Sequence, residues 1–300
     1  MISILASPKS FSPAFASIQD RAIESWNRLH AEVEVILYGK DEGVGDAASR
    51  YGCHHVSDIP CSKSGVPLFN AIADHANRHA RFNLQMYLNA DIILPPDLLL
   101  RIAPVQCQRF VITGERIDLE KEVEWNTSEP WEARLKCLME MGLACAHGPT
   151  GMDYFIFPRG LWDTLKPLPV GRGGYDGALL AHCLRHRIPL VDATRVLPIL
   201  HQWHEYSQLP GGLMEVHHGV EAQAIRRDHD IWHSPPSVAD ADWVLLPGGL
   251  KSGNCRGDRL RYLEVHLRYR LRWKRLSYGL RALWRVRAKL LHSQPRAAWV

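Results

Sequence analysis

A polar segment follows an apolar run near residue 90. The sequence Tyr87-Leu88-Asn89-Ala90-Asp91-Ile92-Ile93 leads from a predicted strand at 84–88 into an asparagine and an aspartate. Ligands of open α/β sheets bind at the carboxyl ends of strands, and a carboxylate there can hold a divalent cation that neutralises a diphosphate. Asp91 is therefore a candidate metal ligand, with Asn89 beside it; the alternative is that both are turn residues after a strand.

A glycine-rich loop carries a second carboxylate. The segment Gly171-Arg172-Gly173-Gly174-Tyr175-Asp176 places Asp176 near the first turn of a predicted helix and leaves Arg172 free to reach a phosphate. Asp176 is a candidate general base for an acceptor hydroxyl. The alternative is a structural role, in which Asp176 stabilises the helix N-terminus through the macrodipole.

Two histidines follow a later apolar run. His201 comes directly after the strand-like segment 196–200, and His204 lies three residues further on. The two side chains can share a metal if the segment is helical, and otherwise only one of them points to the site. The chain has 16 histidines, so this spacing alone also fits chance.

Strands and helices alternate in the first half. Four apolar runs are predicted strands, at 2–5, 33–38, 53–56 and 84–88. Apolar residues that recur every three or four positions predict a helix: Ile18, Ala22, Trp26 and Leu29. Further helices are expected at about 44–51 and from Pro67 to His79, because proline suits the first turn of a helix. This alternation favours a parallel sheet with right-handed crossovers.

The second half is mixed. Strands are expected at 110–113, 154–157 and 188–191, and helices at 131–141 and 175–186. Residues 207–255 contain Pro-Gly-Gly twice and Ser-Pro-Pro once. Because such clusters mark turns and loops, we expect a loop-rich segment that completes or covers the domain.

Composition restricts the class of protein. The hydrophobic fraction of 46% and the charged fraction of 23% are those of a globular protein. No run of about 18 apolar residues is present, and the N-terminus lacks the pattern of a secretory signal. The seven cysteines form an odd set without a Cys-x-x-Cys pair, which favours reduced thiols in the cytoplasm over a disulfide or zinc scaffold.

In combination these motifs resemble bacterial family 2-like glycosyltransferases of the GT-A fold. The matching segments span residues 1–206 in the order of the family: Ser7 to Phe11, Ile18 to Trp26, Tyr87 to Ile93, Asp153 to Pro158, Gly171 to Asp176, Asp192 to Thr194, and His201 to His204. The resemblance implies a Rossmann-type α/β fold with a mixed, mainly parallel sheet flanked by helices. It also implies transfer of a sugar from a nucleotide-diphosphate donor to a hydroxyl of a glycan, lipid-linked or other acceptor, with Mn²⁺ or Mg²⁺.

The resemblance assigns roles to particular residues. Asp91 matches the metal-binding acid of a D-x-D-type motif, whose first position is Asn89 here, a departure from the usual acid. Asp176 matches the catalytic base, and His201 or His204 matches the late histidine that contacts metal or diphosphate.

Further positions are expected to line the donor and acceptor sites. The expected donor-binding residues are Pro8, Lys9, Gly39, Asp41, Asn70, Asn89 and Arg172. Asp153 is expected to orient the acceptor, with a structural cap as the alternative.

Two other functions stay open. A sugar nucleotidyltransferase of similar fold would need a glycine- and lysine-rich loop after the first strand, and residues 6–13 lack glycine. A non-catalytic module that binds nucleotide or glycan is compatible with Asn89 in place of an acid.

The C-terminus is strongly basic. From residue 256 onward there are thirteen Lys and Arg against two acids, a balance of +11, so the net +4 of the whole chain leaves −7 for residues 1–255. An apolar stripe accompanies the charges, at Leu260, Leu263, Leu267, Leu271, Leu276, Leu280, Leu283 and Trp284. A basic amphipathic helix of this type fits an anionic membrane surface; the alternatives are packing on the body or on another subunit.

These observations divide the chain into three segments. We expect a transferase domain at 1–206, the loop-rich segment at 207–255 and a basic helical tail at 256–300. The acidic body and the lack of nucleic-acid motifs argue against nucleic-acid binding. The expected location is the cytoplasm, with contact to the inner face of the membrane.

Overall fold

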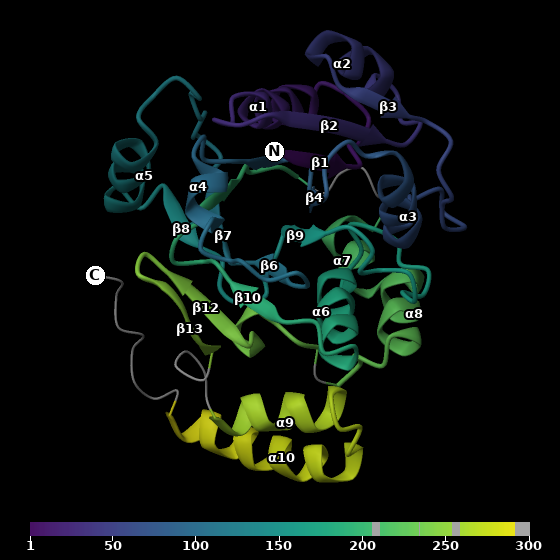
Figure 1. Ribbon diagram of the computed structural model, residues 1–300, viewed down its shortest axis with the longest axis vertical. Helices are drawn as coiled ribbons and strands as arrows, with labels where there is room; N and C mark the ends of the chain where they lie inside the picture. The colour runs from purple at the N-terminus through teal and green to yellow at the C-terminus, as the bar shows by residue number, and fades with distance from the viewer. Residues whose placement is uncertain (206–210, 234, 254–258, 292–300) are drawn as a thin grey trace.

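The computed structural model describes residues 1–205, 211–233, 235–253 and 259–291. Within these residues the main feature is a nine-stranded sheet of order β13-β12-β10-β6-β9-β4-β1-β2-β3 (Figure 1). Its strands are β1 (Ile2–Ala6), β2 (Val33–Tyr38), β3 (His54–Val56), β4 (Leu84–Leu88), β6 (Val111–Thr113), β9 (Tyr154–Pro158), β10 (Leu190–Asp192), β12 (Trp243–Leu246) and β13 (Gly249–Ser252).

The sheet is mixed and mainly parallel. Strand β1 pairs in parallel with β2 and β4, β2 with β3, and β10 with β6 and β12. Strand β9 runs antiparallel to both β4 and β6, and β13 is antiparallel to β12. This confirms the predicted fold class, a mainly parallel sheet flanked by helices.

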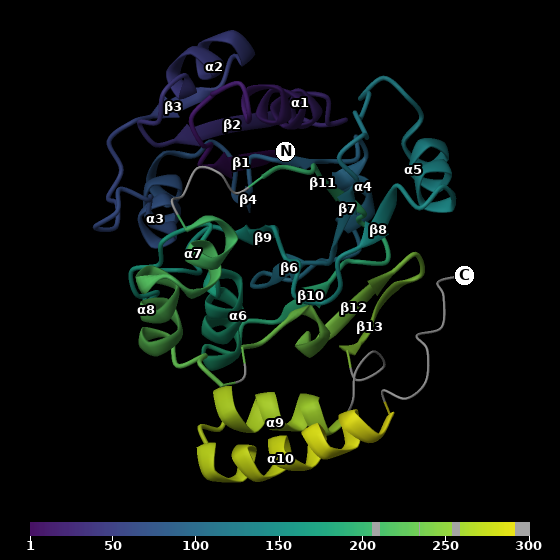
Figure 2. The same ribbon diagram turned by 180° about the vertical axis from the view of Figure 1, so that it is seen from behind.

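Helices cover both faces of the sheet (Figure 2). Ile2, Ile4 and Ala6 of β1 share one core with α1 (Ala16–Asn27), α2 (Val44–Tyr51) and α4 (Leu98–Ile102). Leu5 points to the other core, with α3 (Phe69–His79), α6 (Tyr175–Arg185) and α8 (Val220–Asp228). Successive residues of a strand point to opposite faces, so β1 separates two helical layers.

A smaller sheet adjoins the end of β4. Its order is β5 (Ile92–Ile93), β11 (Ile199–His201), β7 (Arg116–Leu119) and β8 (Ala144–Ala146). Helix α5 (Trp131–Glu140) packs on it through Trp131, Leu135 and Leu138. The sequence did not predict this sheet, whose strand β11 carries His201.

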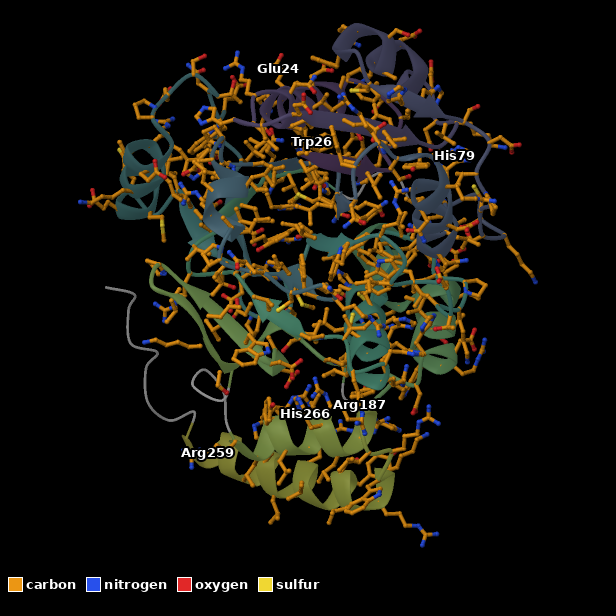
Figure 3. The ribbon with its side chains drawn as sticks, in the orientation of Figure 1. Glu24, Trp26, His79, Arg187, Arg259 and His266 are labelled. Carbon is orange, nitrogen blue, oxygen red and sulfur yellow. The ribbon has the colours of Figure 1, made fainter. Side chains whose placement is uncertain are left out.

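The regular spacing of α1 buries one helix face. Ile18, Ala22 and Trp26 are buried, and Ala22 and Trp26 pack in the core that they share with β1. The indole N–H of Trp26 also donates to the carbonyl of Ile92, at 2.9 Å (Figure 3). Helix α1 is thereby fixed next to the segment that follows Asp91.

The helix predicted from Pro67 begins two residues later, at Phe69. Pro67 forms a bridge with Cys61, and Leu68 forms one with Pro169. These extended pairings hold the backbone before Phe69, so proline precedes the helix instead of opening it.

The prediction of a loop-rich segment at 207–255 is wrong. Its described part contains α7 (Gly212–His218), α8, a short 3₁₀ helix η1 (Val238–Asp240) and the hairpin β12–β13. The second Pro-Gly-Gly forms the hairpin turn and the first residue of β13, Gly249, which has a φ of 105°. Of the first Pro-Gly-Gly, Gly211 and Gly212 lie at the start of α7, and its proline lies outside the described residues. The clusters thus mark turns between elements, and β12 and β13 extend the large sheet.

The basic C-terminal segment folds as two antiparallel helices, α9 (Arg259–Tyr269) and α10 (Lys274–Leu291) (Figure 1). Val265 and Tyr269 of α9 are buried in the core that includes α6. Basic side chains of the hairpin also pair with acidic residues of the body: Arg261 with Asp240, Arg268 and Lys274 with Asp230, and Arg270 with Asp242. Figure 3 shows His266 on the side of α9 that faces the body, where it lies 3.3 Å from Asp242.

Helix α9 is therefore integral to the body and is not a free tail. The apolar stripe that runs from Leu260 to Trp284 changes phase at the turn between α9 and α10, where Arg272 has a φ of 58°. Within the described part of the chain, every helix is too short or too polar to cross a bilayer.

Candidate active site

Asp91, His201 and His204, here called the metal group, converge after β4. Nε2 of His204 lies 3.1 Å from Oδ2 of Asp91, and Nε2 of His201 lies 3.8 Å from the same oxygen. One ligand atom from each residue falls within 4.8 Å of the others. Antiparallel pairing of β5 with β11 sets His201 opposite Ile92, which brings the end of β11 to Asp91.

The histidines meet without a helix, because Gln202 fixes the intervening backbone. The side-chain amide of Gln202 donates to the carbonyl oxygens of Asp91, at 3.1 Å, and Ile18, at 2.8 Å. Its Oε1 accepts from Arg21 of α1 at 2.8 Å. Residues 202–205 are irregular, so the expectation that both histidines reach the site only from a helix is wrong.

The metal group fits a divalent cation. Oδ1 of Asp91 is buried and has no hydrogen-bond partner among the described residues. Nδ1 of His201 lies 3.1 Å from Oδ1 of Asp118, and Nδ1 of His204 lies 3.0 Å from the carbonyl of Glu205. Histidine ligands commonly donate their second ring N–H to a carboxylate or carbonyl in this way. A carboxylate and two imidazole nitrogens form a reasonable donor set for Mn²⁺, Zn²⁺ and related ions.

Two histidines and a lysine surround Asp91. Burial alone would raise the pKa of Asp91, but His201, His204 and Lys9 together hold that pKa well below its usual range. The Lys9 ammonium lies over the ring of Phe15, 4.6 Å from its centroid. Burial lowers the pKa of Lys9, and the negative charges of Asp91 and Asp153 partly oppose this shift. Lys9 therefore lies near enough to Asp91 for their charges to interact, and its role in donor binding stays a prediction.

Asn89 and Asp153 bind each other. The Asn89 amide donates to Oδ1 of Asp153 at 2.6 Å, and its carbonyl oxygen accepts from the Tyr175 hydroxyl at 3.4 Å. The second oxygen of Asp153 accepts from Arg116 at 2.6 Å. Asn89 is thus engaged with Asp153, and both oxygens of Asp153 already accept hydrogen bonds.

Arg116 and Asp118 of β7 were not singled out from the sequence. The Nε of Arg116 donates to Asp118 at 2.7 Å, and His147 contacts the other oxygen of Asp118 at 2.7 Å. Burial alone would raise the pKa of Asp118, but His147, His201 and Arg116 hold it far below its usual range. The alternation of polar and apolar residues at 116–119 is the sequence signal of this half-buried strand.

Asp176 lies in the first turn of α6, after Gly174 at a φ of 96°. One of its oxygens accepts from the N–H of Gly177 at 2.8 Å. Burial raises the pKa of Asp176 to about 6; the N–H of Gly177 opposes this shift, and the charge of Asp153 adds to it. A carboxylate with this pKa is suited to accept a proton near neutral pH.

The glycine loop packs on α7 and α8. The N–H of Gly173 donates to the carbonyl of Val216 at 2.8 Å, and a methyl group on Gly173 would lie 2.8 Å from Cα of His217. Arg172, predicted to be free for a phosphate, binds Glu221 of α8 through Nε at 2.8 Å. The prediction that Arg172 is free is therefore wrong for its Nε, because this nitrogen already donates to an acid. That acid lies on α8, a helix that the sequence did not predict.

The other predicted donor residues lie at the ends of β1 and β2 and on α3. Pro8 is buried, and Asp41 is exposed. Gly39 has a φ of 113°, and a side chain there would lie 3.6 Å from Asp41 and 3.8 Å from Ser7, so the two strand-end loops are adjacent. Asn70 accepts from the N–H of Leu168 at 3.2 Å and so holds the segment before the glycine loop.

No family model matches this sequence, and no curated protein matches it. Among solved structures, it is similar to the mannosyltransferase PcManGT of Pyrobaculum calidifontis in complex with GDP-Man and Mn²⁺, with 12% identity, a TM-score of 0.43, and coverage of 68% of this chain and 56% of that one. Glucosyl-3-phosphoglycerate synthase of Mycobacterium tuberculosis gives 16% identity, a TM-score of 0.43, and coverage of 76% and 80%. Residues 1–349 of S. aureus TarS in complex with UDP-GlcNAc give 10% identity, a TM-score of 0.31, and coverage of 42% and 37%.

This chain therefore spans little more than half of the mannosyltransferase.

Proposed function

We propose that this chain is a divalent-metal-dependent glycosyltransferase that moves a sugar from a nucleotide-diphosphate donor to an acceptor hydroxyl. The observation that carries the proposal is the metal group, in which two imidazoles and a carboxylate meet at the carboxyl end of β4. One oxygen of that carboxylate has no hydrogen-bond partner in the part of the chain that the structure describes. The series of motifs along residues 1–206 supports the same function.

The donor side of the reaction depends on charge. Asp91, His201 and His204 would hold Mn²⁺ or Mg²⁺, which supplies neutralisation of the donor diphosphate. Lys9 lies where its charge acts on Asp91 and Asp153, and it would contribute further positive charge beside the diphosphate. Pro8, Gly39 and Asp41 form the adjacent loops that would receive the nucleoside.

The acceptor side depends on Asp176. Its raised pKa leaves it mostly ionised above about pH 6 and still basic enough to take the proton of an acceptor hydroxyl. Asp153, the other candidate carboxylate, accepts from Asn89 and Arg116 with both oxygens and is less available as a base. It would position the acceptor or support Asn89.

Thermal unfolding with nucleoside diphosphates tests the proposal. We expect UDP, GDP or another nucleoside diphosphate to raise the Tm of the full chain when Mn²⁺ is present, and Asp91→Asn to abolish this rise. Asp74→Asn is the control, because Asp74 pairs with Arg78 on the exposed side of α3. An unchanged response of Asp91→Asn would refute the site.

Slow metal-dependent hydrolysis of the matching nucleotide sugar would distinguish a transferase from a non-catalytic binding module. Binding without any turnover, with or without acceptors, would favour the module.

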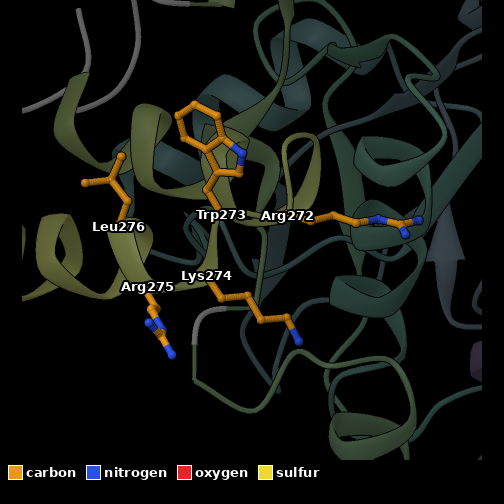
Figure 4. Close-up of a pocket in the computed structure, with 5 residues that line it drawn as sticks. All are labelled: Arg272, Trp273, Lys274, Arg275 and Leu276. Carbon is orange, nitrogen blue, oxygen red and sulfur yellow. The ribbon is translucent and has the colours of Figure 1, made fainter.

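We also propose that the outer face of α10 contacts an anionic membrane. Trp273, Leu276 and Leu283 are 59%, 51% and 61% exposed. Leu276 and Leu283 are seven residues apart and so lie on one stripe of α10, and Trp273 directly precedes the helix. Exposed Arg272 and Arg275 flank them, and a hollow of about 440 Å³ lies at the turn (Figure 4). Apolar and aromatic side chains beside arginines are typical of helices that lie in the interface of an anionic bilayer.

Vesicle flotation tests the membrane proposal. The full chain should float with phosphatidylglycerol-containing vesicles at low salt and lose binding as salt shortens the Debye length to about 8 Å. Joint replacement of Trp273, Leu276 and Leu283 by serine should abolish flotation, whereas serine at exposed Leu213 and Met214 of α7 should not. Loss of a dimer in the triple variant, without any vesicle binding, would instead indicate a second copy on this face.

A further inference from the structure

Asp118 lies beside His201 in the smaller sheet. Parallel pairing of β7 with β11 sets His201 directly opposite Asp118. Nδ1 of the His201 ring faces Asp118 at 3.1 Å, and Nε2 faces Asp91 at 3.8 Å. The ring therefore spans two carboxylates, one within the metal group and one behind it.

Asp118 is held in place by groups outside the metal group. Arg116 donates through Nε to Oδ1 at 2.7 Å, and His147 lies 2.7 Å from Oδ2. Arg116 extends the contacts to Asp153 at 2.6 Å. Asp118 and Arg116 thus connect His201 to Asp153, the carboxylate that accepts from Asn89.

We infer that Asp118 is a positioning residue: it accepts the Nδ1–H of His201, fixes that tautomer and turns the Nε2 lone pair toward a cation beside Asp91. The inference rests on the proposed metal-dependent function. His204 has an equivalent acceptor in the carbonyl of Glu205 at 3.0 Å. Each histidine of the metal group therefore has its own acceptor on the side away from Asp91, as ligating histidines require for a fixed orientation.

The test is the Mn²⁺ affinity of the full chain, measured by calorimetry or electron paramagnetic resonance without donor. Asp118→Asn should weaken Mn²⁺ binding by about 10- to 100-fold, the usual effect of removing such an acceptor. Asp242→Asn is the matched control, because Asp242 also pairs with an arginine and a histidine but lies outside the metal group. It accepts from Arg270 at 2.6 Å and lies 3.3 Å from His266, both residues of the C-terminal segment. The Mn²⁺ affinity of Asp242→Asn should equal that of the unaltered protein, and an Asp118→Asn affinity within twofold of the unaltered protein overturns the inference.

A second measurement applies if Asp118→Asn does not fold. Nitrogen-15 NMR of the unaltered, histidine-labelled protein with Zn²⁺ should show His201 protonated at Nδ1, with the signal assigned by its loss in His201→Gln. Protonation at Nε2 instead would overturn the inference.

Asp91→Asn separates this inference from the proposed function. If Asp91→Asn loses Mn²⁺ and Asp118→Asn does not, only the role of Asp118 is refuted. If the unaltered protein binds no metal, or Asp91→Asn binds it equally well, the proposed metal site is refuted and the role of Asp118 falls with it.

Discussion

Replacing Asp176 by asparagine should stabilise the protein at neutral pH while it removes activity. In the folded chain the pKa of Asp176 is about 6, above the ordinary 3.8 that it regains on unfolding. The folded state therefore binds the proton more tightly, and its stability falls as pH rises from about 4 through 6. At about 1.4 kcal/mol for each unit of pKa, ionised Asp176 costs the folded state about 2 to 3 kcal/mol above pH 6. Asparagine carries no charge and keeps an oxygen for the N–H of Gly177.

Urea unfolding between pH 4 and 8 measures this effect. Asp176→Asn should raise the free energy of unfolding by about 2 to 3 kcal/mol at pH 7 to 8, and the gain should shrink as pH falls through 6 and vanish near pH 4. Donor turnover should fall by about 10²- to 10⁴-fold, with donor affinity unchanged, because a base acts in the transition state.

Asp46→Asn is the matched control. Asp46 lies in the first turn of α2, after Gly43 at a φ of 80°, much as Asp176 follows Gly174, but its side chain is exposed. Its replacement should lower stability by about 0.3 to 1 kcal/mol through loss of the macrodipole interaction. If Asp176→Asn lowers stability at pH 7 in the same way, Asp176 is a helix-stabilising residue. The base must then be sought elsewhere, with Asp153 the next candidate.

Three further predictions concern the metal, the asparagine and the glycine loop. Two imidazoles in the metal group should favour Mn²⁺ over Mg²⁺, so nucleoside diphosphate should raise the Tm more with Mn²⁺ at equal concentration; a larger rise with Mg²⁺ would contradict this donor set. Asn89→Asp would replace the donor to Asp153 by a second carboxylate and should lower the free energy of unfolding by about 1 to 3 kcal/mol, without tighter Mn²⁺ binding in calorimetry. Gly173→Ala should lower the free energy of unfolding in urea by about 1 to 3 kcal/mol, because the added methyl group would contact the backbone of His217. Gly248→Ala should lower it far less, because a methyl group on Gly248 would have no atom within 4 Å.

Much of the large sheet could be predicted because its first half carries clear periodicities. Trp26 and its neighbours at spacings of three and four predicted α1, and the apolar run before Asn89 predicted β4 and the position of Asp91. The smaller sheet was missed because its strands have only two to four residues. The strand-like segment 196–200 was recognised, but nothing in the sequence indicated which strands it pairs with. Asp118 and Arg116 were missed with the smaller sheet, although residues 116–119 alternate between polar and apolar.

Contacts between residues far apart in the sequence could not be predicted either. Arg172 was expected to be free because Glu221 is 49 residues away in sequence and lies on a helix that the sequence did not reveal. The leucine stripe predicted amphipathic helices at the C-terminus, but not which side of α9 faces the body. That side is defined by the burial of Val265 and Tyr269 and by ion pairs to Asp230, Asp240 and Asp242.

The four aspartates around the site differ in what accompanies them, and this separates their roles. Asp91 has two histidines and the charge of Lys9, and Asp118 has Arg116 and two histidines, so the pKa of each stays low despite burial. Asp153 accepts from Arg116 and Asn89. The hydrogen-bond donors to Asp176 among the contacts described are backbone N–H groups, and burial, with an addition from the negative charge of Asp153, raises its pKa. Environments that push the pKa values of neighbouring carboxyl groups apart mark the division between electrostatic and acid–base roles. The low pKa values of Asp91 and Asp118 fit the roles that we propose for them beside a cation, and the pKa of about 6 fits the proposed role of Asp176 as the base.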